Sequence, residues 1–422
     1  MFDRVTDLSE NLTGGAGSSG DADPGPLADL LDDDEQLAHV LANGGTIQYT
    51  KDGRETTVEP SDDHNAFVLV TDSRILFVLG DQPEEIEIEI EMTDLTASHI
   101  RSGLLSSKLV VKTDDESVVF GPDEGDLEAA EDFIDRIGDC WVDMQTAFAQ
   151  ARAEMTDFEE RCASGKDPRE MALSAKSHLS KARHAATRQD GAPTDKINAR
   201  IDKVEVELER RRVGAWLERA ETNVERVGET RDGDSWGDDA LIALVDATEA
   251  VDRARETVED SNHPPEDVEE RLATLSDRVD ALADEFVADV ETGITEARAA
   301  EDPLEAADRW ETVADRYRSA LDAGWDGVAD RSADALKYQL TWVDAKRVDA
   351  LAEHARQRER EGDESDDSDR AQDCFEDAEE WLERAIDLSQ SRDVGTEDVF
   401  ASALDRVEEK KLEQSGWEFG KA

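Results

Sequence analysis

The 422-residue sequence predicts an α+β protein in which a small antiparallel β domain precedes a long all-α region of helix hairpins. Two observations support this fold class. Between residues 46 and 120, short apolar runs and strict two-residue alternation recur between turn signals. Beyond about residue 126 the apolar residues follow a helical period instead. The predicted divisions are a flexible leader at 1–26, the β domain with its closing helix at 27–140, and a helical repeat region at 141–422.

The N-terminal 26 residues are rich in Gly, Ser and Pro, ending in Pro24-Gly25-Pro26, which is typical of a flexible leader. The leucines and valine between Leu27 and Leu41 then predict a short amphipathic helix, closed by Gly44-Gly45.

Eight strands are expected after this helix, and the connections between them are short. They fall at 46–50, 54–59, 65–71, 74–79, 85–91, 94–100, 107–113 and 116–120. Isoleucine alternates with glutamate along 85–91, as in a strand with one buried and one wet face. Asp-Gly at 52–53, Asp-Ser at 72–73 and Asp-Asp at 114–115 predict tight hairpins and therefore an antiparallel sheet.

The run Phe67-Val68-Leu69-Val70-Thr71-Asp72-Ser73-Arg74-Ile75-Leu76-Phe77 resembles the strand-turn-strand signature of prokaryotic PH-like (pleckstrin-homology-type) domains. The spacing Ile90-x-x-x-x-Leu95, the segment 103–111, Val118-Val119-Phe120 and a terminal helix are similar to the rest of that pattern. The resemblance covers roughly residues 27–140. It implies two orthogonal antiparallel sheets capped by a C-terminal helix, with Asp72 capping the turn in a structural role.

Helices are expected from Asp126 to the end, in alternating long and short lengths. Long helices are predicted near 124–162, 194–229, 265–300 and 327–361, short ones near 169–188, 238–260, 303–322 and 369–390, and a last one at 396–414. An apolar heptad seam runs from Leu127 to Cys162, so the helix that closes the β domain should continue as a coiled-coil-like arm.

The helical region also repeats. The four short helices align on similar basic and apolar positions, and Trp-Leu-Glu-Arg-Ala occurs twice, at 216–220 and 381–385. We therefore expect four degenerate helix-hairpin repeats of roughly seventy residues, stacked in a solenoid-like way.

The net charge of −60 excludes whole classes of partner. A surface this anionic does not neutralise phosphates, so nucleic acid is not an expected partner, and charge-driven docking onto an anionic membrane is disfavoured. With 58 Asp and 49 Glu but 13 Lys against 34 Arg, the composition resembles that of cytosolic proteins of extreme halophiles. A cytoplasmic location also agrees with three widely spaced cysteines and with the lack of any apolar stretch of about 20 residues.

No catalytic or metal-binding motif emerges. The sequence lacks HExxH, GxGxxG, GxSxG and zinc-type Cys/His spacing, and the Glu-x-x-His pairs of carboxylate metal sites in helix bundles are absent. We therefore expect no enzyme, no cofactor and no small-molecule substrate. The predicted function is that of an interaction or scaffold protein, which binds a protein partner or self-associates.

The alternative function is peripheral membrane targeting. Some PH domains bind lipid headgroups through basic residues between their first two strands, so the resemblance implies Lys51 and Arg54 as candidate ligand contacts, with Arg101 and Lys108 elsewhere on the domain.

Overall fold

Two antiparallel sheets followed by helices make up the computed structural model, which confirms the predicted α+β class. The structure describes residues 27, 30–32, 35–60, 66–79, 86–103, 106–188, 192–231, 236–261, 266–394 and 397–414. The predicted leader at 1–26 lies outside them. The chain divides into two compact units, Met1–Arg212 and Val213–Ala422, and each is described by itself.

The first sheet has the strand order β1-β4-β5-β6. Its strands are β1 (Leu37–Asn43), β4 (Ala66–Thr71), β5 (Arg74–Leu79) and β6 (Ile86–Glu91). The second sheet has the order β3-β2-β9-β8-β7. Its strands are β2 (Ile47–Lys51), β3 (Arg54–Val58), β7 (Ala97–Ser102), β8 (Ser107–Lys112) and β9 (Glu116–Phe120).

The predicted hairpins form at all three turn signals. Val70 pairs with Ile75 across the Asp-Ser turn, Lys51 with Arg54 across Asp-Gly, and Lys112 with Ser117 across Asp-Asp. At the Asp-Gly turn both residues have positive φ, 50° at Asp52 and 75° at Gly53, as a type I′ hairpin turn requires.

The helix predicted between Leu27 and Leu41 is wrong over its second half. Residues 37–43 form strand β1, which pairs antiparallel with β4 from Leu37↔Thr71 to Asn43↔Ala66. A short apolar run does not distinguish a helix from a strand by its period, and here the unpaired edge of β4 selects the strand.

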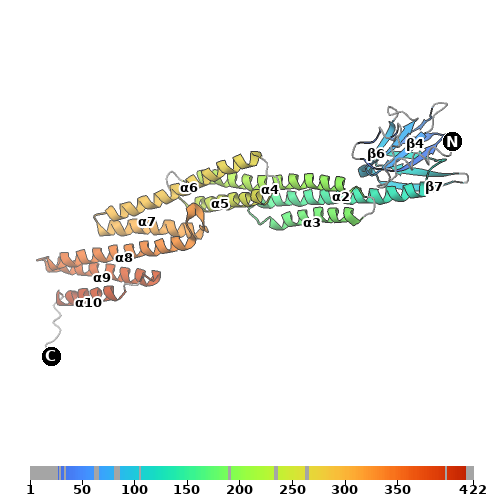
Figure 1. The fold of residues 1–422 in the computed structure, drawn as a ribbon. Helices are drawn as coiled ribbons and strands as arrows, with labels where there is room; N and C mark the ends of the chain where they lie inside the picture. The colour runs from blue at the N-terminus through green and yellow to red at the C-terminus, as the bar shows by residue number, and fades with distance from the viewer. Residues whose placement is uncertain are drawn as a thin grey trace, which may run out of the picture. The chain divides into compact units, whose positions relative to one another are not determined.

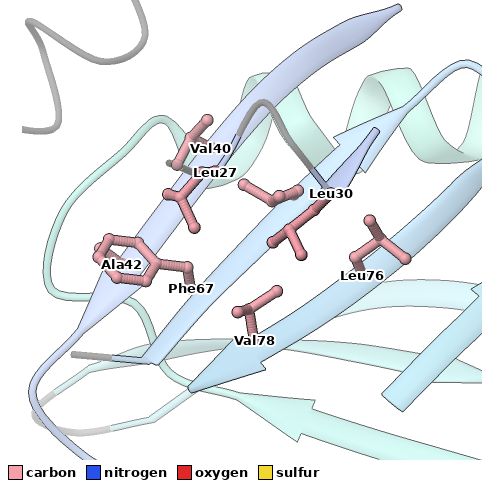
Figure 2. Close-up of a cluster of buried hydrophobic side chains, with 8 residues drawn as sticks. Leu27, Leu30, Val40, Ala42, Phe67, Leu76 and Val78 are labelled. Carbon is pink, nitrogen blue, oxygen red and sulfur yellow. The ribbon is translucent and has the colours of Figure 1, made fainter. Parts of the chain in front are cut away.

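Strands β4 and β5 are buried on both faces. The side chains of one face point to the domain interior, where Phe77 meets Phe120 edge-to-face at 6.4 Å. On the opposite face Leu27 and Leu30 pack against Val40, Ala42, Phe67, Leu69, Leu76 and Val78 (Figure 2). We call this second set, from Val40 to Val78, the outer face of the first sheet.

Helix α2 (Leu127–Ala163) closes the sheet domain and continues without a break, as its apolar seam predicts (Figure 1). The Asp126 carboxylate accepts the Ala129 backbone N–H at 3.0 Å and starts the helix. The helix packs against β7, β1 and the 3₁₀ turn η2 (Met92–Asp94). It approaches closely because Gly138 has no side chain: a Cβ there would lie 2.8 Å from Leu95.

The remaining helices match the predicted hairpins closely. They are α3 (Arg169–Arg188), α4 (Thr194–Thr230), α5 (Asp238–Glu259), α6 (Glu266–Ala299), α7 (Pro303–Asp322), α8 (Ala333–Asp363), α9 (Ser368–Arg392) and α10 (Glu397–Gln414). In the second unit each helix from α5 to α10 packs against the next in the sequence.

Helix α8 starts later than the predicted residue 327. A 3₁₀ turn, η3 (Val328–Asp330), precedes it and contains Ala329 at a φ of 52°. Trp325 is buried here, 1% exposed, and donates its indole N–H to the Val328 carbonyl at 2.9 Å, so the chain turns before the helix begins.

Within the described part of the chain, none of the helices contains a stretch that is both long and apolar enough to cross a membrane.

Candidate functional site

A groove lies in the first unit between the sheet domain and helix α2, and it encloses about 730 Å³. Strand β6 and the turn after it form one wall, the β8–β9 turn forms the second, and α2 forms the third. Its lining residues are Glu89, Ile90, Thr93, Asp94, Leu95, Thr96, Thr113, Asp114, Asp115, Glu116, Val142, Gln145 and Thr146.

The β8–β9 turn is closed by its own first residue. The Thr113 N–H donates to the Glu116 carbonyl at 2.9 Å, and the Thr113 hydroxyl accepts the Glu116 N–H at 3.0 Å. This reciprocal pair closes the turn, and the Asp115 carbonyl accepts the Asp52 N–H of the neighbouring turn at 3.4 Å. The two carboxylates at its tip, Asp114 and Asp115, are therefore exposed at the rim of the groove.

Helix α2 presents a short stripe beside its buried seam. Val142, Gln145 and Thr146 share one face because residues three and four apart are neighbours on a helix. The Val142 side chain is 43% exposed, whereas its neighbour Trp141 is 1% exposed in the domain interior. Val142 thus adds a partly exposed apolar contact point to a groove whose other apolar lining residues, Ile90 and Leu95, are buried.

The groove is strongly acidic. Five of its lining residues carry a carboxyl group, and none of the described residues that line it is basic. Glu89 is engaged by Arg74 at 2.6 Å and Glu116 by Lys51, whereas Asp114 and Asp115 form no ion pair within the described part of the chain.

The pKa of a glutamate next to the groove reflects this concentration of negative charge. Burial raises the pKa of Glu91, which lies beside the groove, and the charges of Glu89 and Asp94 raise it further, against the opposing effects of Arg200 and Arg74. A ligand for this groove should therefore bring cations or hydrogen-bond donors to the rim and a small apolar group to Val142.

The volume of the groove lies in the range of small-ligand and peptide sites. Among the described residues, no three His, Cys, Asp or Glu side chains converge closely enough to hold a metal ion. The groove carboxylates are accordingly spread along its walls.

The four candidate contacts from the sequence form two separate pairs. Lys51 and Arg54 face each other across the β2–β3 turn, and Arg101 and Lys108 face each other across β7 and β8. Lys51 lies level with Glu116 on β9, while Lys108 lies one residue beyond the Leu109↔Phe120 pair. At about 3.3 Å per residue, some five residues or roughly 17 Å separate the pairs along the strands.

The pair at the β2–β3 turn is not a bare cationic patch. Lys51 pairs with Glu116, and the hydrogen bond between them lowers the pKa of the Glu116 carboxyl and raises that of Lys51. The Lys108 stem lies over Gly121, 3.4 Å from the position a Cβ would take there. The structure therefore does not gather the four predicted contacts into one site.

The sequence did not predict the groove. Its acidic residues come from two separate segments, 89–94 and 114–116, and neither segment stands out in so acidic a protein. One signal was present: Val142 is an apolar residue outside the heptad seam of its helix. Its position opposite the β8–β9 turn depends on how α2 packs.

Comparison with protein-family models, with curated proteins and with solved structures finds no match to this chain.

Proposed function

We propose that this chain is a non-enzymatic interaction protein of a halophile-type cytoplasm. In this proposal the sheet domain is a PH-like docking module that binds a segment of a protein partner in the groove beside α2. The helices of the second unit supply an extended protein-binding surface.

The groove is the observation that carries the proposal. A groove between a sheet and its capping helix is a common place for a peptide to bind, because it offers backbone partners and side-chain pockets together. Here the walls combine hydrogen-bonding threonines, exposed carboxylates and the partly exposed Val142. The order of two antiparallel sheets followed by a packed helix agrees with the PH-like resemblance of the Thr71-Asp72-Ser73-Arg74 segment.

The alternative, targeting to lipid headgroups, has less support. A headgroup phosphate is best held by several cations that converge, and Lys51 and Arg54 lie about 17 Å along the strands from Arg101 and Lys108. The carboxylates of Glu116, Asp114 and Asp115 also surround the Lys51 end of the sheet.

The test compares three full-length proteins as bait at multimolar KCl. Val142→Arg with Thr146→Arg places two long side chains in the groove, and Leu173→Arg makes the same kind of change on α3, where Leu173 is 70% exposed. We expect one identified protein to bind the wild type and the Leu173 variant stoichiometrically and to be lost from the groove variant. Equal recovery by all three baits, or no stoichiometric partner, would refute docking in the groove.

A further inference from the structure

The outer face of the first sheet is covered by residues just before β1. We call the described residues Leu27, Leu30–Asp32 and Glu35–Gln36 the N-terminal cover. Leu27 is 2% exposed and Leu30 is 6% exposed, and both lie over the apolar outer face (Figure 2). Since this face includes Phe67, Leu69 and Leu76, its exposure to water would be costly.

The polar contacts of the cover converge on the β4–β5 turn, Thr71–Arg74. The buried Glu35 carboxylate accepts the Arg74 guanidinium, with Nε–Oε1 at 3.0 Å and Nη2–Oε2 at 2.9 Å. It also accepts the Thr71 hydroxyl at 2.6 Å. The Arg74 Nη2 donates in addition to the Leu30 carbonyl at 3.2 Å, so one guanidinium holds the cover at both Leu30 and Glu35.

Asp72 makes the next contacts to the cover. Its backbone N–H donates to the Gln36 carbonyl at 3.0 Å, and its Oδ1 accepts the Gln36 N–H at 3.2 Å. Asp72 is only 4% exposed, so its end of these bonds is buried, whereas Gln36 is an exposed residue.

The same turn is held from its other side by helices of the first unit. The Trp141 indole of α2 donates to the Asp72 carbonyl at 3.0 Å. Lys196, in the first turn of α4, reaches the Asp72 Oδ1 at 3.2 Å and the Ser73 hydroxyl at 2.9 Å. The Arg200 guanidinium lies 4.7 Å from the centre of the Trp141 ring and ties the two helices to the same point.

One oxygen atom, Oδ1 of Asp72, therefore accepts from the cover through Gln36 and from α4 through Lys196, and it also accepts the neighbouring Ser73 hydroxyl at 3.1 Å. A buried carboxylate that loses its cation is destabilised where it stands and shifts to regain solvation. Such a shift withdraws the acceptor from Gln36. Gln36 lies beside Glu35, the main attachment of the cover. Loss of the bond from the Gln36 N–H to Asp72 Oδ1 therefore favours opening of the cover.

We propose that the Thr71–Arg74 turn couples the seating of the start of α4 to the closure of the N-terminal cover. An event that draws Lys196 away from Asp72 opens the cover and exposes the apolar outer face. Binding linkage is reciprocal, so opening of the cover also loosens the start of α4. The turn thus acts as a conformational relay between a helix and a concealed apolar surface.

The test is hydrogen exchange of the full-length protein, read separately in residues 35–43, in residues 197–204 of α4 and in α9 as a reference. Lys196→Met removes the cation, Lys203→Met makes the same change at an exposed position of the same helix, and Glu35→Gln weakens the cover directly. We expect Lys196→Met to speed exchange in 35–43 at least five-fold and Glu35→Gln to speed exchange in 197–204 similarly, with α9 unchanged.

Two further variants complete the design. Lys203→Met should leave all three regions as in the wild type, and Lys196→Arg, which keeps a cation within reach of Asp72, should restore protection of 35–43. The proposal is overturned if Lys196→Met leaves exchange in residues 35–43 unchanged, or if Glu35→Gln leaves exchange in residues 197–204 unchanged. It is also overturned if Lys196→Met accelerates α9 as much as the cover, since the lysine would then act on global stability alone.

Discussion

A buried carboxylate on α8 allows a quantitative prediction. The Glu359 side chain is 9% exposed and receives Arg406 of α10 in a two-bond fork, with Nε–Oε1 and Nη2–Oε2 both at 2.8 Å. Lys410, one turn further along α10, reaches Oε1 at 2.8 Å. The hydrogen bond from Arg406, supported by that from Lys410, outweighs burial and lowers the pKa of Glu359 to about 2.

The lowered pKa sets the size of the effect. An unfolded glutamate titrates near 4.3, and each pH unit between the two pKa values corresponds to about 1.4 kcal/mol, so ionised Glu359 contributes up to about 3 kcal/mol. Because the folded pKa is the lower one, this stability is fully present above the unfolded pKa. It is lost as the pH falls toward 2, and about 2 kcal/mol remains at pH 3.5.

The measurement is hydrogen-exchange protection of α10 in the wild type and in Glu359→Gln, corrected for the intrinsic exchange rate at each pH. We expect the variant to lose up to about 3 kcal/mol of opening free energy at pH 7, and the deficit to narrow by about 1 kcal/mol at pH 3.5.

A matched control is Glu380→Gln on α9, where Glu380 pairs with Arg384 at 2.6 Å but both side chains are more than half exposed. Exposed pairs contribute little, so this variant should change protection by less than about 0.5 kcal/mol. The reasoning fails if the two variants lose the same protection, or if the Glu359 deficit is as large at pH 3.5 as at pH 7.

Two further predictions concern packing and the buried ion pair. Gly362→Ala should destabilise α8 by about 1–3 kcal/mol, because the added Cβ would lie 2.7 Å from the buried Phe375 ring. The matched variant is Gly228→Ala at an exposed position of α4, where the added Cβ meets no neighbouring atom within 4 Å. It should stabilise the protein by up to about 1 kcal/mol, since alanine favours a helix over glycine. Urea unfolding measures the change in the free energy of unfolding for both variants. Changes of the same sign would contradict the packing argument. Arg74→Met should cost about 3–5 kcal/mol, because it leaves the Glu35 carboxylate, 1% exposed, without its guanidinium. Adding Glu35→Leu to Arg74→Met should recover much of the lost stability, measured by thermal unfolding, because no buried charge is then left unpaired. If the stability losses of the two single variants simply add in the double variant, the ion-pair argument is contradicted.

The elements with a clear local signal were predictable. The Ile-Glu alternation of 85–91 and the Asp-Gly turn at 52–53 depend on neighbours in the sequence, and both form as expected. The heptad seam from Leu127 to Cys162 likewise becomes the unbroken helix α2. These signals suffice because the period of the apolar side chains already selects helix or strand.

The error at residues 37–43 has a physical cause. This segment is short and apolar, so its own propensity does not decide its structure. Pairing with β4 does, since an uncovered β4 would leave its backbone hydrogen-bonding groups unpaired at that edge.

The candidate site was less predictable than the fold. The PH-like resemblance implies Lys51 and Arg54 as ligand contacts, with Arg101 and Lys108 elsewhere on the domain. The register of the second sheet places these cations in two pairs at different levels. Conversely, the sequence carries one weak signal for the groove, the apolar Val142 outside the heptad seam of α2. The groove exists only because α2 carries Val142 past the β8–β9 turn.

The sequence alone determined the order of a hairpin-built sheet domain and a helical region, because turn chemistry and apolar period are local properties of the chain. Its charge of −60 also disfavoured nucleic-acid partners. The tertiary structure decided which of many carboxylates line a groove. It also brought to Asp72 two of its partners, Gln36 and Lys196, which lie 160 residues apart in the sequence. Contacts over such separations depend on how whole elements pack, and no local pattern of residues encodes them.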